Sequence, residues 1–363
     1  MGLYMYFFDQ VEFERRYNCT TYSVDVVPIA KRIHPYFGLL FIFLGIFYES
    51  LYIPVIYALS QKNVRKLGFC YEIMLSMTIY GLISMPFTSM MTGFYAINGD
   101  VHCTDQEAMF FTGLILMSLW CGYSQTSVLL AFNRCMLLNR WSGFLFRGRQ
   151  RFLWFLYPLC WSLAVLIFGN PGFYNSVYNV WLFDPHKGYV EDSSFSYIHP
   201  IQIANNCVII LFLPVIYINF YTKYMKPVDN EPNRMTDQEY ALLMQALAVN
   251  VTIAVATFFY TVLQFCGLPS FLLPLANLSW IFVQGFPAIL YLMFNYHVRD
   301  VIFREIAWIN AIQDQLEITR EILDRQAAEG TVHPTEPDPK SCPNWFILML
   351  LMYILNCLVV FID

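Results

Sequence analysis

Seven long apolar segments between residues 37 and 296 constrain this chain more than any other feature of its sequence. Each is close to the ~20 residues that one helix needs to cross the ~30 Å hydrocarbon core of a bilayer. The sequence is 58% hydrophobic and only 13% charged, which is unlike a water-soluble domain. The segments lack the apolar–polar alternation of a membrane β-barrel, and a backbone in lipid must form its hydrogen bonds within its own segment. The sequence therefore predicts an all-α membrane protein built as a seven-transmembrane helix bundle.

These spans divide the chain into four parts. We expect an extracellular N-terminal segment over residues 1–36 and the bundle over residues 37–296. A cytoplasmic amphipathic helix with a Pro-rich linker is expected over residues 297–344, and an extra apolar C-terminal segment over residues 345–363. The seven spans are expected at Phe37–Leu59, Ile73–Ile97, Ala108–Phe132, Phe152–Gly169, Ile201–Tyr221, Tyr240–Phe265 and Phe271–Phe294.

Charges in the short loops predict how the bundle is oriented, because loops rich in Lys and Arg stay in the cytoplasm. The loops after the first, third and fifth spans are basic and contain Lys62, Arg65, Lys66, Arg140, Arg147, Arg149, Arg151, Lys223, Lys226 and Arg234. The loops on the other side are mainly acidic and contain Asp100, Asp105, Glu107, Asp184, Glu191 and Asp192. The N-terminus is therefore expected outside the cell. There, Asn18-Cys19-Thr20 predicts N-glycosylation of Asn18.

The end of the chain has several interpretations. Residues 298–325 carry apolar side chains at helical spacing, which predicts an amphipathic helix along the inner membrane face. A free helix or a short coiled coil is the alternative. After the Pro-rich residues 331–344, the apolar run Trp345–Phe361 could be an eighth span, an interfacial hairpin or an artefact of the sequence itself.

Short motifs distributed over residues 17–300 resemble one receptor family. They are Tyr17-Asn18-Cys19, His34–Gly38, Leu51–Pro54, Thr92–Gly99 with Cys103, Trp120-Cys121-Gly122, Leu130–Cys135, Phe183-Asp184-Pro185 and Gly285–Leu292 with Asn295. In this order they resemble the nematode serpentine chemoreceptors of class T, the Srt family. The resemblance implies a G-protein-coupled chemoreceptor that binds a small molecule from outside and signals to a heterotrimeric G protein. It also implies a multi-pass protein of the plasma membrane, in the cilia of sensory neurons.

Residues at the inner ends of the spans are candidates for an activation switch. Asn133-Arg134-Cys135 lies where rhodopsin-like receptors have an acidic–Arg–aromatic triplet, and Tyr291 follows Pro287 in the seventh span. An arginine at the inner membrane face can exchange partners between another helix and a bound protein, which makes a two-state element. Asn133 replaces the acid, so the resting ion pair of that triplet cannot form with this residue. The alternative is an ordinary membrane-edge arginine that follows the charge rule.

Two cysteines near the outer face are candidates for a disulfide. Many seven-helix receptors link the loop between spans four and five to span three, but residues 170–200 contain no cysteine here. A Cys19–Cys103 disulfide is therefore expected in an oxidising compartment, with Cys207 as the competing partner and free thiols as the remaining alternative. Most other cysteines lie within spans, and no C-x-x-C or H-E-x-x-H pattern occurs. No metal site and no cofactor are expected.

Aromatic and amide side chains near the outer halves of spans three, five, six and seven are candidates for a ligand pocket. They are Trp120, Tyr123, Gln125, Asn205, Asn206, Tyr260 and Gln264. Apolar walls with a few polar groups suit a small organic ligand, and the lack of a buried counter-charge argues against a strongly charged one. The alternative for each residue is packing between helices.

Other functions fit this chain less well. A seven-helix ion channel with its N-terminus inside conflicts with the charge pattern, and a transporter is expected to show an internal repeat with interrupted helices in two halves. An enzyme would need paired carboxylates, a histidine cluster or an activated nucleophile inside the spans, and the sequence has none there. Nothing points to nucleic acid. The expected partners are the lipid bilayer, a small molecule and a G protein.

Overall fold

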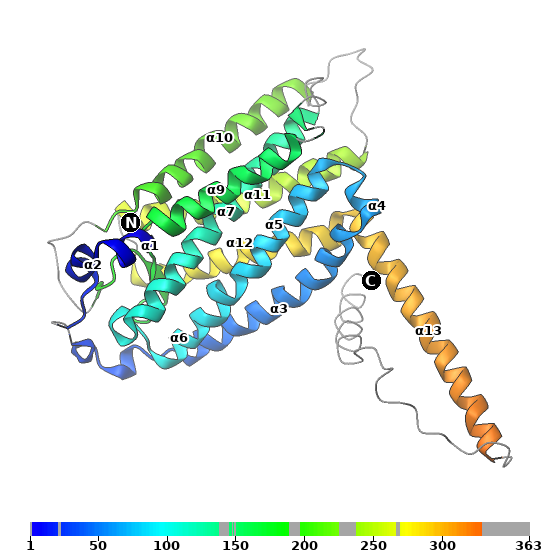
Figure 1. Cartoon of the computed structure of the whole chain (residues 1–363), viewed down its shortest axis with the longest axis horizontal. Coiled ribbons are helices and arrows are strands. Elements are labelled where there is room, and N and C mark those ends of the chain that lie inside the picture. The colour runs from blue at the N-terminus through cyan, green and yellow to red at the C-terminus, as the bar shows by residue number, and fades with distance from the viewer. Residues whose placement is uncertain are drawn as a thin grey trace.

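The computed structural model describes residues 2–20, 23–137, 145–146, 148, 150–188, 197–224, 237–265 and 269–328. Within these residues, seven helical spans are long and apolar enough to cross a membrane. They pack side by side into one bundle (Figure 1). The predicted seven-helix architecture is therefore confirmed. The spans are α3 (Pro35–Ser60), α5 (Phe69–Met85) continuing through η3 (Pro86–Met91) into α6 (Thr92–Asn98), α7 (Gln106–Leu137), α9 (Gln150–Phe168), α10 (Pro200–Tyr224), α11 (Asp237–Phe265) and α12 (Leu273–Phe294).

The second span differs from a single regular helix. The sequence predicts Ile73–Ile97, whereas the helix begins at Phe69 and contains a π-helical segment, η3, that starts at Pro86. Proline lacks the N–H that would continue the α-helical ladder, and a π-helical turn is one way for a helix to accommodate that loss. The span ends at Gly99, whose φ of +75° gives the left-handed cap that glycine adopts without strain.

Helix α7 forms the centre of the bundle. Some 89% of its apolar window is buried, against 17% for α9 and 28% for α10. It contacts α5, α9, α10 and α11. The outer faces of the surrounding helices expose large apolar side chains such as Phe43, Phe212 and Phe258. Such faces are stable when they are solvated by lipid tails rather than water.

The charge pattern predicts that the end of the bundle next to the N-terminal segment faces outward, so it is called the outer end here and the opposite one the inner end. Short elements cover the outer end. They are α1 (Gly2–Phe8), α2 (Gln10–Tyr17), η1 (Val24–Val26), η2 (Ile29–Lys31), η4 (His102–Thr104), η5 (Ser270–Leu272) and the hairpin of β1 (Phe173–Asn175) and β2 (Val180–Leu182). The hairpin is antiparallel, with Tyr174 opposite Trp181, and Asn179 takes the positive φ of 52° in its turn. The cover therefore combines the N-terminal segment with the long loop between α9 and α10.

The inner end carries α4 (Lys62–Arg65) and the long helix α13 (Tyr296–Ala328). Asn295 separates α12 from α13, and its Oδ1 accepts a hydrogen bond of 3.2 Å from the Val298 amide, as an N-cap does. Helix α13 contacts α3 and α12 and then leaves the bundle, running across the direction of the spans (Figure 1). Its placement along the inner membrane face stays a prediction. The Pro-rich linker and Trp345–Phe361 lie outside the described residues.

Two glycines allow the outer loop to lie directly against α7. A Cβ at Gly113 would lie 1.6 Å from the carbonyl oxygen of Gly172, a backbone atom that cannot move on its own. We expect Gly113→Ala to lower the free energy of unfolding by about 1–3 kcal/mol, measured by thermal unfolding of the purified protein in detergent. Gly172→Ala is the matched control, because its nearest neighbour is the flexible end of Met117 at 3.3 Å. Equal melting temperatures for the two variants would contradict this contact.

Candidate functional site

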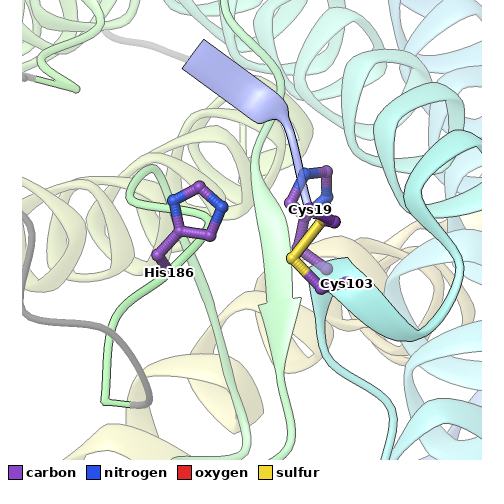
Figure 2. A group of neighbouring side chains, drawn as sticks. Cys19, Cys103 and His186 are labelled. Atoms are coloured by element: carbon purple, nitrogen blue, oxygen red, sulfur yellow. A yellow bond between two sulfur atoms is a disulfide. The ribbon is translucent and has the colours of Figure 1, made fainter. Parts of the chain in front are cut away.

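A disulfide joins the N-terminal segment to the outer mouth of α7. Cys19 and Cys103 are bonded, with their Cα atoms 5.4 Å apart (Figure 2). Cys207, the competing partner considered from the sequence, is a free cysteine on α10. The bond holds the segment that follows α2 against η4. Asn18, the predicted glycosylation acceptor, therefore directly precedes a cysteine that is covalently bonded to η4.

Aromatic rings pack beneath this disulfide. The His102 ring lies 4.3 Å from that of Phe173, and Tyr17 lies 5.2 Å from the same ring, measured between centroids. Burial lowers the pKa of His102 to about 3, so the ring is neutral at physiological pH. Its Nε2–H donates a hydrogen bond of 3.1 Å to the Tyr17 carbonyl oxygen. The N-terminal segment, η4 and β1 thus form one continuous cover.

The hairpin is fixed to the second span, and it closes a small cavity in the outer half of the bundle. Trp181 Nε1–H donates to Thr92 Oγ1 at 2.9 Å, which holds β2 over the bundle. The cavity has a volume of about 10 Å³, roughly the room of one water molecule. Its lining comes from α7, α10, α11, α12 and the outer loop, and consists of Met117, Trp120, Gly172, Trp181, Leu182, Phe183, Gln202, Tyr260 and Trp280.

Three aromatic rings from different helices meet at the inner side of this cavity. Trp280 on α12 lies 5.6 Å from Trp120 on α7 and 4.9 Å from Tyr260 on α11, with both pairs edge to face. Trp120 and Tyr260 were predicted from the sequence as pocket residues, and they line the cavity. Trp280, and the roof made by the outer loop, were not predicted. Their contribution depends on how α12 and the loop fold over α7, which no local sequence pattern encodes.

The predicted amide residues lie elsewhere than in the cavity lining. Gln125 Nε2 donates to Asn205 Oδ1 at 2.7 Å, and Gln125 Oε1 accepts from the Tyr157 hydroxyl. Asn206 Nδ2 donates to Thr261 Oγ1 at 2.9 Å. These bonds tie α7 to α9 and α10, and α10 to α11, which is the packing alternative considered above. A buried amide inside lipid needs such partners.

The last of the predicted amides, Gln264, lies near the end of α11. Its side chain falls outside the described residues.

Tyr123, also predicted as a pocket residue, forms a hydrogen bond to the backbone of α12 next to Pro287. Pro287 has no N–H and so cannot bond to the Val283 carbonyl one turn earlier. The Tyr123 hydroxyl donates to that carbonyl oxygen at 2.8 Å. On the next carbonyl, that of Gln284, the Tyr52 hydroxyl of α3 donates in the same way. Two tyrosines from neighbouring helices thus satisfy the backbone around the proline.

The same region links the two irregular spans. The Thr88 hydroxyl in η3 donates to Gln284 Oε1 at 2.6 Å. The π-helical segment of the second span is therefore bonded to the helix turn just before Pro287. Both bonding partners are buried, so water cannot replace either of them in this hydrogen bond.

At the inner end, Arg134 is buried without a carboxylate partner. Its side chain is only 8% exposed, and the ion pairs formed by the described residues do not include it. Nε and one terminal nitrogen of the guanidinium have no hydrogen-bond partner within the described part, nor have the amide atoms of Asn133. The charge lies near Cys70 of α5 and Tyr291 of α12. Of the three predicted switch residues, Arg134 and Tyr291 thus lie close enough to interact electrostatically, and Asn133 precedes Arg134 in the chain.

The chain matches the family of serpentine type seven-transmembrane GPCR chemoreceptors Srt over residues 1–315. It belongs to the Srt family. The resemblance seen in the motifs is therefore confirmed, and the chain is a multi-pass membrane protein of a receptor family. It is 22% identical to serpentine receptor class T-55 of Caenorhabditis elegans over 294 residues, which is 78% of each protein. The fold is similar to that of squid rhodopsin, with a TM-score of 0.53, 15% identity, and coverage of 78% of this chain and 87% of the other.

Within this Srt fold, the bond between Tyr123 and the α12 backbone leads to a test. We expect Tyr123→Phe to lower the free energy of unfolding by about 1–3 kcal/mol, because the Val283 carbonyl would be left buried without a donor. Thermal unfolding in detergent measures the change. Tyr36→Phe removes the same hydroxyl from a side chain that is 89% exposed and is the matched control. Equal stability of both variants would show that another group satisfies the carbonyl.

Proposed function

We propose that this Srt protein is a chemosensory receptor for a small, uncharged organic molecule and that it activates a heterotrimeric G protein. The observation that supports this most directly is the aromatic group of Trp120, Tyr260 and Trp280 beneath the hairpin roof. Ligand pockets are mainly apolar with a few polar groups, and Gln202 is the main polar side chain in this lining. Among the described lining residues there is no carboxylate, ammonium, guanidinium or imidazole group to pair with a charged ligand.

The ligand must open the cavity to enter it. At about 10 Å³ the space holds one water molecule, whereas an organic molecule needs several times more. Either the hairpin lifts or Trp280 moves. Trp280 shares α12 with Pro287 and Tyr291, so its displacement would act on a helix whose hydrogen-bond ladder is interrupted by proline. In this proposal, the entering ligand displaces the outer half of α12, and the helix transmits that displacement to its inner end.

The displacement of α12 would reach Arg134 at the inner end of the bundle. A buried guanidinium without a carboxylate is costly, so it is ready to donate hydrogen bonds to carbonyl or carboxylate oxygens of a partner protein. We place residues 1–36 outside the cell, residues 37–296 in the membrane, and α13 with the following linker, residues 297–344, in the cytoplasm. The plasma membrane of sensory-neuron cilia is the proposed location.

A G-protein activation assay in cells expressing the receptor tests this proposal. A panel of small uncharged organic compounds is expected to contain an agonist, and Trp280→Ala is expected to raise its half-maximal concentration by about tenfold or more, equivalent to about 1.4 kcal/mol. Trp308→Ala, on the exposed part of α13, is the matched control. An agonist whose potency is unchanged in both Trp280→Ala and Trp120→Ala would rule out this cavity as the binding site.

A further inference from the structure

Four potential metal ligands meet at the outer face. The ligand atoms of Cys19, His102, Cys103 and His186 all lie within 4.8 Å of one another. They come from three separate parts of the chain: the segment after α2, the turn η4 before α7, and the outer loop after β2. Figure 2 shows the two cysteines as a disulfide, with His186 in the same group. No spacing pattern in the sequence indicates this set, because the three parts of the chain that supply the ligands are far apart in the sequence.

The His102 ring is oriented as in a metal-binding histidine. Its Nε2–H is used by the Tyr17 carbonyl oxygen, which fixes the tautomer and leaves the lone pair on Nδ1. Nδ1 is buried and has no hydrogen-bond partner among the described residues. Metal-bound histidines typically donate the other ring N–H to a backbone carbonyl or a carboxylate in this way. The ring centroids of His102 and His186 are 5.8 Å apart.

We propose that, when the disulfide is reduced, Cys19, His102, Cys103 and His186 bind one divalent transition-metal ion of the Zn²⁺ type. Two thiolates and two imidazoles are a common tetrahedral ligand set for zinc, with metal–ligand bonds of about 2.0–2.3 Å. Four ligand atoms already within 4.8 Å of one another need only small side-chain movements to reach that geometry once the sulfur–sulfur bond has opened. The disulfide and the metal are thus alternative links between the N-terminal segment and η4.

The redox step is balanced by an external dithiol or phosphine reductant. The reductant supplies two electrons to the Cys19–Cys103 bond and is itself oxidised, to a disulfide or a phosphine oxide, while two protons produce two thiols. Metal binding then releases these two protons, because the ligands are thiolates. The metal-bound form differs from the disulfide form in one structural respect. It also attaches the outer loop, through His186, to the N-terminal segment and η4.

Cobalt binding to the purified full-length receptor tests the proposal. Co²⁺ is used as a spectroscopic probe, because tetrahedral thiolate ligation gives intense visible and charge-transfer absorption that zinc displaces. The receptor reduced with a phosphine is expected to bind one Co²⁺ with these bands, and the disulfide form is expected to lack them. His186→Ala is expected to weaken binding by about tenfold or more, since even loss of an outer-shell partner costs that much. His34→Ala, a histidine outside the group, is the matched control.

Folding of the variants is checked in the disulfide form without metal, where His186→Ala is expected to unfold in one cooperative transition, as the wild type does, but at a lower temperature because removing the buried ring leaves a cavity. Other cysteines are controlled for with Cys103→Ser, which removes one of the two thiolates of the set and should markedly weaken the thiolate bands. Bands of equal strength in reduced wild type, His186→Ala and Cys103→Ser would overturn the proposal. So would the absence of bands in the reduced wild type, or equal binding by the disulfide form.

Discussion

Replacing Cys103 by serine is expected to lower the free energy of unfolding by about 2–5 kcal/mol. The Cys19–Cys103 disulfide closes a loop with a sequence separation of 84 residues, so its loss greatly increases the freedom of the unfolded N-terminal part. The cover formed by α2, η4 and the hairpin also loses its covalent link. Thermal unfolding in detergent under non-reducing conditions, together with surface labelling in cells, measures the effect.

Cys207→Ser is the matched control for this loss. Cys207 is an exposed free cysteine on α10, and its replacement is expected to change stability by less than about 0.5 kcal/mol. Cys19→Ser should resemble Cys103→Ser, because each removes the same bond. If Cys103→Ser and Cys207→Ser had equal melting temperatures and equal surface levels, the disulfide would have no structural role.

Replacing Arg134 by leucine is expected to abolish G-protein activation while leaving the fold intact. The guanidinium is buried with no carboxylate beside it among the described residues, so it contributes a desolvation cost rather than a stabilising ion pair. Leucine removes that cost, and the melting temperature is expected to stay equal or to rise. In the proposed function the same charge is needed for the partner protein. Measuring thermal stability and G-protein activation on the same preparation separates the two roles.

Arg151→Leu is the control for a change of charge near the inner face. Arg151 is partly exposed and pairs with Glu72 at 3.2 Å, an interaction of the kind that contributes at most about 1 kcal/mol. Activation is expected to be near that of the wild type. A marked loss of stability in Arg134→Leu would instead assign Arg134 a structural role. Full activation by that variant would remove it from the proposed switch.

The spans could be predicted from the sequence because lipid imposes a simple requirement on them. Apolar length alone located all seven, and the errors are confined to the ends and to irregular turns. The helix around Glu72 begins earlier than predicted because one charge is tolerated in its first turn, where it interacts favourably with the helix dipole. The π-helical segment at Pro86 could not be predicted, since several of the spans contain a proline and, within the described residues, only the second span has this geometry.

The site was less predictable, because it is assembled from contacts between distant segments. Trp120 and Tyr260 were found by their chemistry and depth, but Trp181 reaches the cavity only through the hairpin fold. Gln125 and Tyr123 carry polar groups of the kind that contact ligands in binding pockets. What distinguishes them is the partner that each meets, Asn205 in one case and the Val283 carbonyl in the other. A single sequence records none of these pairings.

Topology is the most direct test of the central claim that this Srt protein is a receptor facing outward. Tags at the N-terminus and within residues 225–236 would be labelled in intact and in permeabilised cells. We expect labelling of the N-terminal tag on intact cells and of the inner tag only after permeabilisation. An endoglycosidase shift that is lost in Asn18→Gln is expected as well. Labelling of the inner tag on intact cells, with a protected N-terminus, would contradict the receptor orientation and favour a seven-helix channel instead.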